Sequence, residues 1–159
     1  MFSYYKDYLI RDWKESDRLD AAKVIETVLK EYGLPWQPEE ADQDVLAIEQ
    51  FYLAVEGEFW VVEHQSEIVG TAAYYPILKG NNAVEIRKMY LLPQVRGKGL
   101  GKYLLKALET TIKDRGYQEI FIETASLLKE AVKLYEDYGY QPITEVETKR
   151  CDRAYIKGL

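Results

Sequence analysis

The stretch that most constrains this chain is Arg96 to Gly101, RGKGLG, which joins an apolar, strand-like run at 86–92 to a strongly helical run at 103–112. Three glycines in five positions let the backbone turn tightly and approach a ligand without Cβ collisions. Successive N–H groups at a helix start can then converge on an anion. Lys98 and Lys102 add positive charge beside them. The segment therefore predicts a strand, a phosphate-binding loop and a helix.

Two better known glycine motifs do not fit this loop. A Walker A loop requires G-x-x-x-x-G-K-[ST], but the span 97–102 is one residue short and Tyr103 replaces the hydroxyl that would bind magnesium. A Rossmann fingerprint requires G-x-G-x-x-G, but Gly97 and Gly99 are followed by Lys102 at the third position. Both motifs are excluded by their spacing.

The loop resembles the acetyl-CoA signature Q/R-x-x-G-x-G/A of the GNAT acetyltransferase superfamily, with Arg96, Gly99 and Gly101 at the fixed positions. The similarity continues on both sides of the loop. It includes the strand EIRKMYLL, the helix KYLLKALETTI, the strand EIFIET and the ending AVKLYEDYGY, in the family's order and spacing. A glycine-rich turn that served only as a helix entry would leave these later matches unexplained.

The resemblance implies an α/β (α+β) GNAT fold in one domain over residues 1–159. A mixed central sheet of about six or seven strands would be flanked by about four helices, and its fourth and fifth strands would splay apart around the pantetheine arm of acetyl-CoA. It also implies the residues that bind this cosubstrate: Met89, Tyr90, Leu91, Arg96, Gly97, Lys98, Gly99, Leu100, Gly101 and Lys102. Many relatives carry Asn seven residues before the helix tyrosine, but this chain has Leu128 there, which puts that one contact with CoA in doubt.

Hydrophobic periodicity predicts the remaining elements. The expected strands are 8–13, 59–63, 68–75, 118–124, 140–144 and 151–156, and the expected helices are 17–32, 42–54 and 127–138. Ser16 would cap the first helix, whose apolar positions include Leu19. The segment 34–38 breaks that helix and carries Trp36, and Gly139 would end the last helix.

In the strand before the loop, the alternation of apolar and polar residues shifts by one position. Val84 and Ile86 alternate with Glu85, but the next apolar positions on that side are Met89 and Leu91. One extra residue near 87–88 predicts a β-bulge, which would free backbone groups of Met89 and Leu91 for another partner. The alternative is that Arg87 and Lys88 face solvent and Tyr90 is the residue out of pattern.

Acetyl transfer from a thioester to an amine requires a base, an oxyanion donor and a proton for the thiolate. Glu85 stands where several GNAT enzymes carry a catalytic glutamate, and Glu123 and Glu63, acting through water, are its rivals. The non-catalytic alternative is a surface carboxylate that pairs with Arg87 or a lysine. Tyr135 matches the family's helix tyrosine, whose hydroxyl reaches the CoA sulfur, and is otherwise a core residue. The backbone N–H of Met89 would stabilise the oxyanion.

Composition excludes several other classes of function. The chain is 47% apolar and 30% charged, with one Cys, one His and a net charge of −6. Cys151 and His64 alone cannot form an internal disulfide or a zinc site, so we expect no metal. No run is long and apolar enough to span a bilayer, so we expect a cytoplasmic protein without a membrane partner, and the negative charge argues against nucleic acid.

The charge is divided between two halves of the sequence. No Lys or Arg occurs between Lys30 and Lys79, where ten carboxylates fall, whereas nine basic residues lie from Lys79 to Arg115. A basic half around a phosphate loop suits an anionic cosubstrate, and an acidic half suits a cationic acceptor or is merely a solvated surface.

The sequence therefore predicts acetyl transfer from acetyl-CoA to a small amine. The rivals are acetylation of a peptide or protein and a CoA-binding regulatory module without turnover. Acceptor residues are expected around 32–36, Phe51 and Trp60. The oligomeric state stays open and includes a homodimer.

Overall fold

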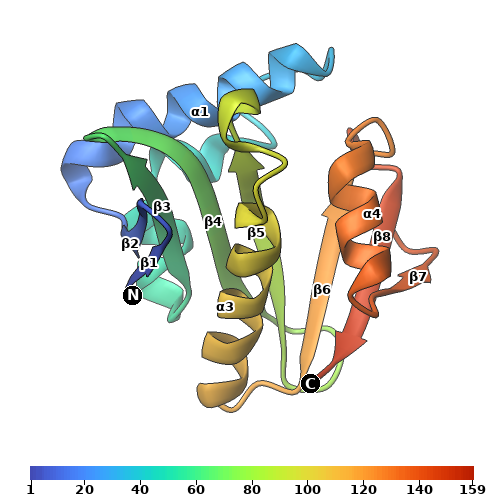
Figure 1. The fold of residues 1–159 in the computed structure, drawn as a ribbon. Coiled ribbons are helices and arrows are strands. Elements are labelled where there is room, and N and C mark those ends of the chain that lie inside the picture. The colour runs from blue at the N-terminus through green and yellow to red at the C-terminus, as the bar shows by residue number, and fades with distance from the viewer.

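The computed structural model describes all residues from 1 to 159 and contains a single eight-stranded sheet with helices on both faces (Figure 1). The strand order is β1-β2-β3-β4-β5-β6-β8-β7, and all neighbours are antiparallel except β5 and β6. The strands are β1 (Phe2–Tyr5), β2 (Tyr8–Asp12), β3 (Glu58–His64), β4 (Glu67–Ile77), β5 (Ala83–Leu91), β6 (Glu119–Thr124), β7 (Gln141–Ile143) and β8 (Arg153–Gly158). The α-helices are α1 (Arg18–Glu31), α2 (Ile48–Phe51), α3 (Leu100–Asp114) and α4 (Lys129–Asp137).

The two faces of the sheet carry two separate apolar clusters. Side chains of α3 and α4 pack on one face, and side chains of α1 and α2 pack on the other. Strand β3 serves both, because Trp60 and Val62 belong to the first cluster while Phe59 and Val61 belong to the second. A strand covered by helices on both faces needs a continuous apolar run rather than alternation. Trp60 is fully buried in this way, so its expected place among the acceptor residues is wrong.

Strands β5 and β6 pair over only one part of their length. Residues Ala83 to Ile86 face Glu119 to Ile122, and from Arg87 onward β5 has no partner on that side. The two strands diverge towards the top of Figure 1. The splayed pair expected from the sequence is thus present, but it is formed by the fifth and sixth strands because β1 adds a strand before the expected first one.

The predicted bulge is confirmed in β5. Thr71 of β4 faces Tyr90 and Ala73 faces Arg87, so Lys88 and Met89 together stand opposite a single residue. Lys88 has a φ of 52° and is only 5% exposed, which rules out the alternative of a solvent-facing side chain. The Thr71 hydroxyl donates to the Lys88 carbonyl over 2.6 Å and fastens the bulge to β4.

The first helix differs from its predicted start. Ser16 is exposed and does not cap it; a short 3₁₀ turn (Glu15–Asp17) precedes α1, and the Asp17 carboxylate accepts the Lys14 N–H over 2.8 Å. Leu19, counted among the apolar positions, is 77% exposed.

The predicted helix at 42–54 is wrong as a continuous element. It consists of α2 between two 3₁₀ turns, Gln43–Leu46 and Leu53–Val55. Asp42 and Asp44 both point inward to the Lys88 ammonium. Residues two apart do not face the same way on a helix, so these contacts require a different backbone.

The last helix ends as its glycine predicts. Gly139 has a φ of 87°, and the N–H groups of Gly139 and Tyr140 donate to the carbonyls of Glu136 and Tyr135. This pair of bonds is a Schellman ending, which favours glycine because the left-handed conformation strains other residues. It turns the chain from α4 into β7.

Candidate functional site

Two pockets meet where β5 leaves β6. We call the first the loop pocket; it has a volume of about 240 Å³ and is lined by Val28, Tyr32, Met89, Tyr90, Leu91, Arg96, Gly97, Gly99, Gly101, Lys102, Leu128, Glu130, Ala131 and Tyr135. The second, the bulge pocket, has a volume of about 60 Å³ and is lined chiefly by β5, β6 and the segment before β8. Met89, Tyr90 and Tyr135 line both, so the two pockets are contiguous.

The glycine loop leads directly into α3 at one end of the loop pocket. Gly99 is the N-cap of α3 with a φ of 86°, and no side chain caps the helix. The first intrahelical bond runs from the Tyr103 N–H to the Gly99 carbonyl over 3.0 Å, so the preceding N–H groups have no helical acceptor. With Lys102 beside them, these groups form the electropositive end of a helix facing a cavity, which suits an anion.

Most of the cosubstrate residues expected from the sequence line the loop pocket. Two side chains do not: Leu100 is buried in the core, and Lys98 is exposed on the outer side of the loop. The Lys98 carbonyl accepts hydrogen bonds from the Tyr5 hydroxyl at 2.6 Å and the Lys6 ammonium at 3.2 Å. The β1–β2 hairpin, which sequence reasoning missed, therefore fastens the loop from outside.

Arg96 is held by the protein itself. Its guanidinium makes a two-pronged contact with the Glu31 carboxylate at 2.7 and 2.8 Å and also donates to the Tyr32 hydroxyl. Its Nε donates to the Leu91 carbonyl over 3.0 Å, so that carbonyl is not free as the bulge argument expected. Arg96 thus ties α1 and β5 to the loop, a role that no local pattern could reveal because its partner lies 65 positions away.

Glu85 lies in the wall of the bulge pocket, partly buried between β4 and β6. Burial raises its pKa above the ordinary glutamate value, while Arg87 and a hydrogen bond from the Tyr75 hydroxyl at 3.0 Å act against that rise. A carboxylate with a raised pKa can take up a proton nearer to neutral pH.

The two rival carboxylates are placed differently. Glu123 also lines the bulge pocket, but its two oxygens accept the N–H groups of Glu147 and Thr148, each at 2.9 Å. Glu63 lines neither pocket and pairs with Arg11 at 3.0 Å on the far side of β3. Only Glu85 combines a place in the wall with an oxygen that no backbone N–H occupies.

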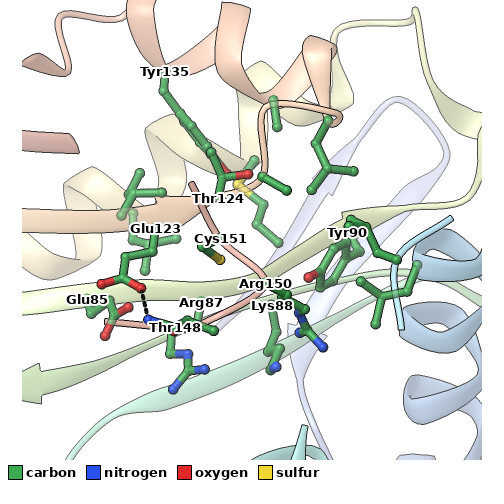
Figure 2. A pocket seen from close by; sticks show the side chains of 18 residues that line it. Glu85, Arg87, Lys88, Tyr90, Glu123, Thr124, Tyr135, Thr148, Arg150 and Cys151 are labelled. Atoms are coloured by element: carbon green, nitrogen blue, oxygen red, sulfur yellow. Dashed lines mark hydrogen bonds between the residues drawn. The ribbon is translucent and has the colours of Figure 1, made fainter. Parts of the chain in front are cut away.

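Tyr135 stands between the pockets. Its side chain comes from α4, on one face of the sheet, whereas Glu85 and Arg87 lie on the other side of the opening (Figure 2). Burial raises the pKa of its phenol, and its hydroxyl makes no hydrogen bond within the protein. It is therefore a neutral O–H group directed at the junction.

The bulge pocket also contains residues that sequence reasoning did not assign to a site. Lys88 and Arg150 both bind the Asp42 carboxylate, Lys88 at 2.7 Å, and Lys88 lies 3.4 Å from Asp44. Burial raises the pKa of Asp42, but the Arg150 hydrogen bonds and the Lys88 charge outweigh it, so the net shift is downward. The sequence signal for this buried network was the pair of adjacent cations, Arg87 and Lys88, inside an otherwise apolar strand.

Cys151 occupies the middle of the same pocket (Figure 2). Burial, followed by the nearby Glu123 charge, raises the pKa of its thiol to about 11, which keeps the thiol neutral and unreactive. His64 is distant and bonds Asp7 on the surface. No group of three or more His, Cys, Asp or Glu side chains could hold a metal ion. None of the helices has both the length and the apolar character needed to cross a bilayer.

The acidic half of the chain is largely neutralised by the rest of the protein. Six of its ten carboxylates pair with basic side chains: Glu31, Asp42, Asp44, Glu49, Glu58 and Glu63. A large part of the charge asymmetry in the sequence is therefore taken up by ion pairs within the protein.

Known proteins resemble this chain in sequence and in fold. The model of the Acetyltransferase (GNAT) family matches residues 22–140. YjgM of Escherichia coli (strain K12), named as an uncharacterized N-acetyltransferase, is 36% identical over 77% of this chain and 75% of its own length. N-acetyltransferase 8F1 of Rattus norvegicus is 30% identical over 69% of this chain, which spans only 52% of that relative.

Solved structures share the fold. An acetyltransferase of the GNAT family from Staphylococcus aureus Mu50 has a TM-score of 0.87 at 22% identity, with 95% of this chain and 98% of that one covered. An acetyltransferase from Streptococcus agalactiae 2603 has a TM-score of 0.88 at 22% identity, covering 98% and 100%.

The buried network around Asp42 gives a stability prediction. Asp42→Ala would leave the Lys88 and Arg150 cations buried without their shared partner, so we expect the free energy of unfolding to fall by about 3–5 kcal/mol. Glu39→Ala, which removes an exposed carboxylate of the same segment, should change it by less than about 0.5 kcal/mol. Urea unfolding of both variants measures the difference, and an equal small effect would contradict the network's role.

Proposed function

Since the chain belongs to the GNAT acetyltransferase family, we propose that it transfers an acetyl group from acetyl-CoA to the primary amine of a small-molecule acceptor. The observation that carries the proposal is the pair of contiguous pockets, one ending at an uncapped helix start and the other at the partly buried Glu85. All eight strands lie in one sheet, and we take residues 1–159 as one catalytic domain.

Acetyl-CoA would occupy the loop pocket. The pyrophosphate fits the N–H groups between Gly97 and Lys102, where backbone donors and the positive end of the α3 dipole coincide. The pantetheine arm would follow the unpaired edge of β5 at Met89 to Leu91, which directs the thioester towards the junction. Leu128 lines both pockets and offers this arm an apolar contact where many relatives have Asn.

The acceptor would enter the bulge pocket with its amine towards Glu85. Glu85 takes one proton from the ammonium, and the nitrogen lone pair attacks the thioester carbonyl carbon to form the C–N bond. The backbone N–H of Met89 at the bulge stabilises the oxyanion. The C–S bond then breaks, and Tyr135 gives its proton to the departing thiolate. The second proton that the nitrogen loses restores the Tyr135 phenol, so the products are an amide and free CoA thiol, with the first proton left on Glu85.

The size of the bulge pocket supports a small acceptor. Its volume is about 60 Å³, and the residues at 148–151 that line it are tied through Arg150 to the Asp42 carboxylate. A peptide would need more room at this point than a small amine. We therefore favour a small amine over a peptide or protein acceptor.

A direct test is thiol release from acetyl-CoA with two panels of acceptors. We expect the best small primary amines to give kcat/KM values well above those of peptides with free N-termini. Thiol detection measures both panels under the same conditions. Faster turnover of the peptides would overturn the assignment of acceptor class.

The loop assignment predicts the effect of Gly99→Glu. A Cβ at this position would lie 2.5 Å from the Tyr5 hydroxyl, so the side chain would displace the hairpin contact and shift the loop N–H groups, and it would add a negative charge next to the phosphate site. Loss of several charge-assisted contacts, each worth about 1.5–3 kcal/mol, should lower acetyl-CoA affinity by at least about 10²-fold. Isothermal titration calorimetry measures the affinity.

A matched control is Gly116→Glu. Gly116 also has a positive φ, of 91°, but follows the other end of α3 with open space around it, so the change carries the same backbone strain and charge. It should bind acetyl-CoA like the wild type. Unchanged affinity in folded Gly99→Glu would refute the loop as the phosphate site.

Glu85→Gln should separate chemistry from cosubstrate binding. Removing the base should lower kcat by about 10²–10⁴-fold with acetyl-CoA affinity nearly intact. In the wild type, activity requires the ionised carboxylate, so the rate falls as pH drops through a pKa that burial has raised. The variant should lose this acidic limb, which pH profiles of kcat/KM measure.

Two comparison variants keep this test specific. Glu145→Gln removes an exposed carboxylate and should retain both the rate and the limb. If Glu123→Gln lost the limb while Glu85→Gln kept it, the base would be Glu123.

A further inference from the structure

Most charges around the bulge pocket are already paired. Lys88 and Arg150 share Asp42, and Asp44 accepts from the Tyr52 hydroxyl besides lying near Lys88. Both Glu123 oxygens are occupied by backbone N–H groups. The two cations and the two aspartates therefore balance one another, and Glu123 is held by the backbone.

Arg87 is the cation without a carboxylate partner. It is largely buried and lines the bulge pocket, yet no Asp or Glu oxygen lies within 4.0 Å of its guanidinium. Its one side-chain hydrogen bond goes from a terminal nitrogen to the Tyr75 hydroxyl, at 3.3 Å. A guanidinium carries five N–H donors, so most of the Arg87 donors are available to a ligand.

Glu85 is the matching anion on the same strand. Glu85 and Arg87 are two residues apart, so they face the same side of β5 about 6.6–6.8 Å apart along the strand. The Tyr75 hydroxyl lies between them, donating to Glu85 at 3.0 Å and accepting from Arg87. A carboxylate and a guanidinium held apart in this way complement a molecule that carries both an ammonium and a carboxylate.

We infer that the acceptor is an amino acid whose amine faces Glu85 and whose carboxylate binds the Arg87 guanidinium. The inference rests on the proposed function and specifies its substrate class. It reverses the preference for cationic amines that the charge asymmetry of the sequence suggested, because six of the ten carboxylates in the acidic half are already paired. A planar guanidinium binds a carboxylate through two parallel N–H donors, which fixes the orientation of the amine.

The experiment compares each standard amino acid with its own carboxamide, which keeps the amine and removes the negative charge. Spermidine serves as the cationic reference. The best amino acid should exceed its carboxamide in kcat/KM by at least about 10²-fold. The reason is that the Arg87 guanidinium stays unpaired in the pocket when the ligand has no carboxylate.

The variant Arg87→Gln should reduce the ratio between acid and carboxamide towards one, mainly through KM for the acid, because the contact is made before and during transfer. Arg87→Lys keeps the charge and should retain part of the preference. Arg153→Gln removes an exposed cation of β8 and should leave the ratio unchanged. Calorimetry with acetyl-CoA verifies that each variant is folded and binds its cosubstrate.

The outcomes separate the inference from the proposed function. If carboxamides or spermidine react as well as amino acids, or if Arg87→Gln keeps the preference, the inference is wrong while small-amine acetylation stands. If acetyl-CoA binds but no member of the panel releases thiol, the proposed function fails, and the inference fails with it.

Discussion

The opening between β5 and β6 depends on one buried lysine at the bulge. Lys88 adopts a left-handed backbone conformation, which costs a residue with a side chain about 1–3 kcal/mol. Its ammonium is held by Asp42 and Asp44, and its carbonyl by the Thr71 hydroxyl. Because these contacts exist only when the extra residue is accommodated at this position, they fix where β5 leaves its neighbour. Both pockets begin at that point.

The same network holds Lys88 and Arg150 in the wall of the bulge pocket. Asp42 receives the Gln37 N–H and the Arg150 guanidinium in addition to Lys88, so three segments distant in sequence meet at one carboxylate. Buried ion pairs gain little net stability because desolvation offsets their attraction, but breaking one is costly. Such a network therefore acts mainly as a positional constraint. It fixes the positions of Lys88 and Arg150 relative to each other.

Local patterns predicted the parts of this protein that local rules govern. The glycine loop, the bulge and the Gly139 helix end each follow from a few adjacent residues, and the family order supplied the sheet. The prediction of a continuous helix at 42–54 was wrong because Asp42 and Asp44 both contact Lys88, which lies 44–46 positions away. The periodicity of the segment itself does not reveal these contacts. The Arg96–Glu31 contact and the β1–β2 hairpin on the loop are hidden from the sequence for the same reason. The site residues themselves stay predictions.

Arg87 differs from the other cations of the bulge pocket because Lys88 and Arg150 have carboxylate partners and Arg87 has none. In a buried pocket, the charge that a ligand brings must be compensated, because the low dielectric makes an unpaired ion expensive. An amino acid places its ammonium at Glu85 and its carboxylate at Arg87, and this balance persists when a proton moves from the amine to Glu85. A polyamine would keep a second ammonium beside Arg87 after the same proton transfer. The electrostatics at this pair thus disfavour the polyamine both on entry and during acetyl transfer.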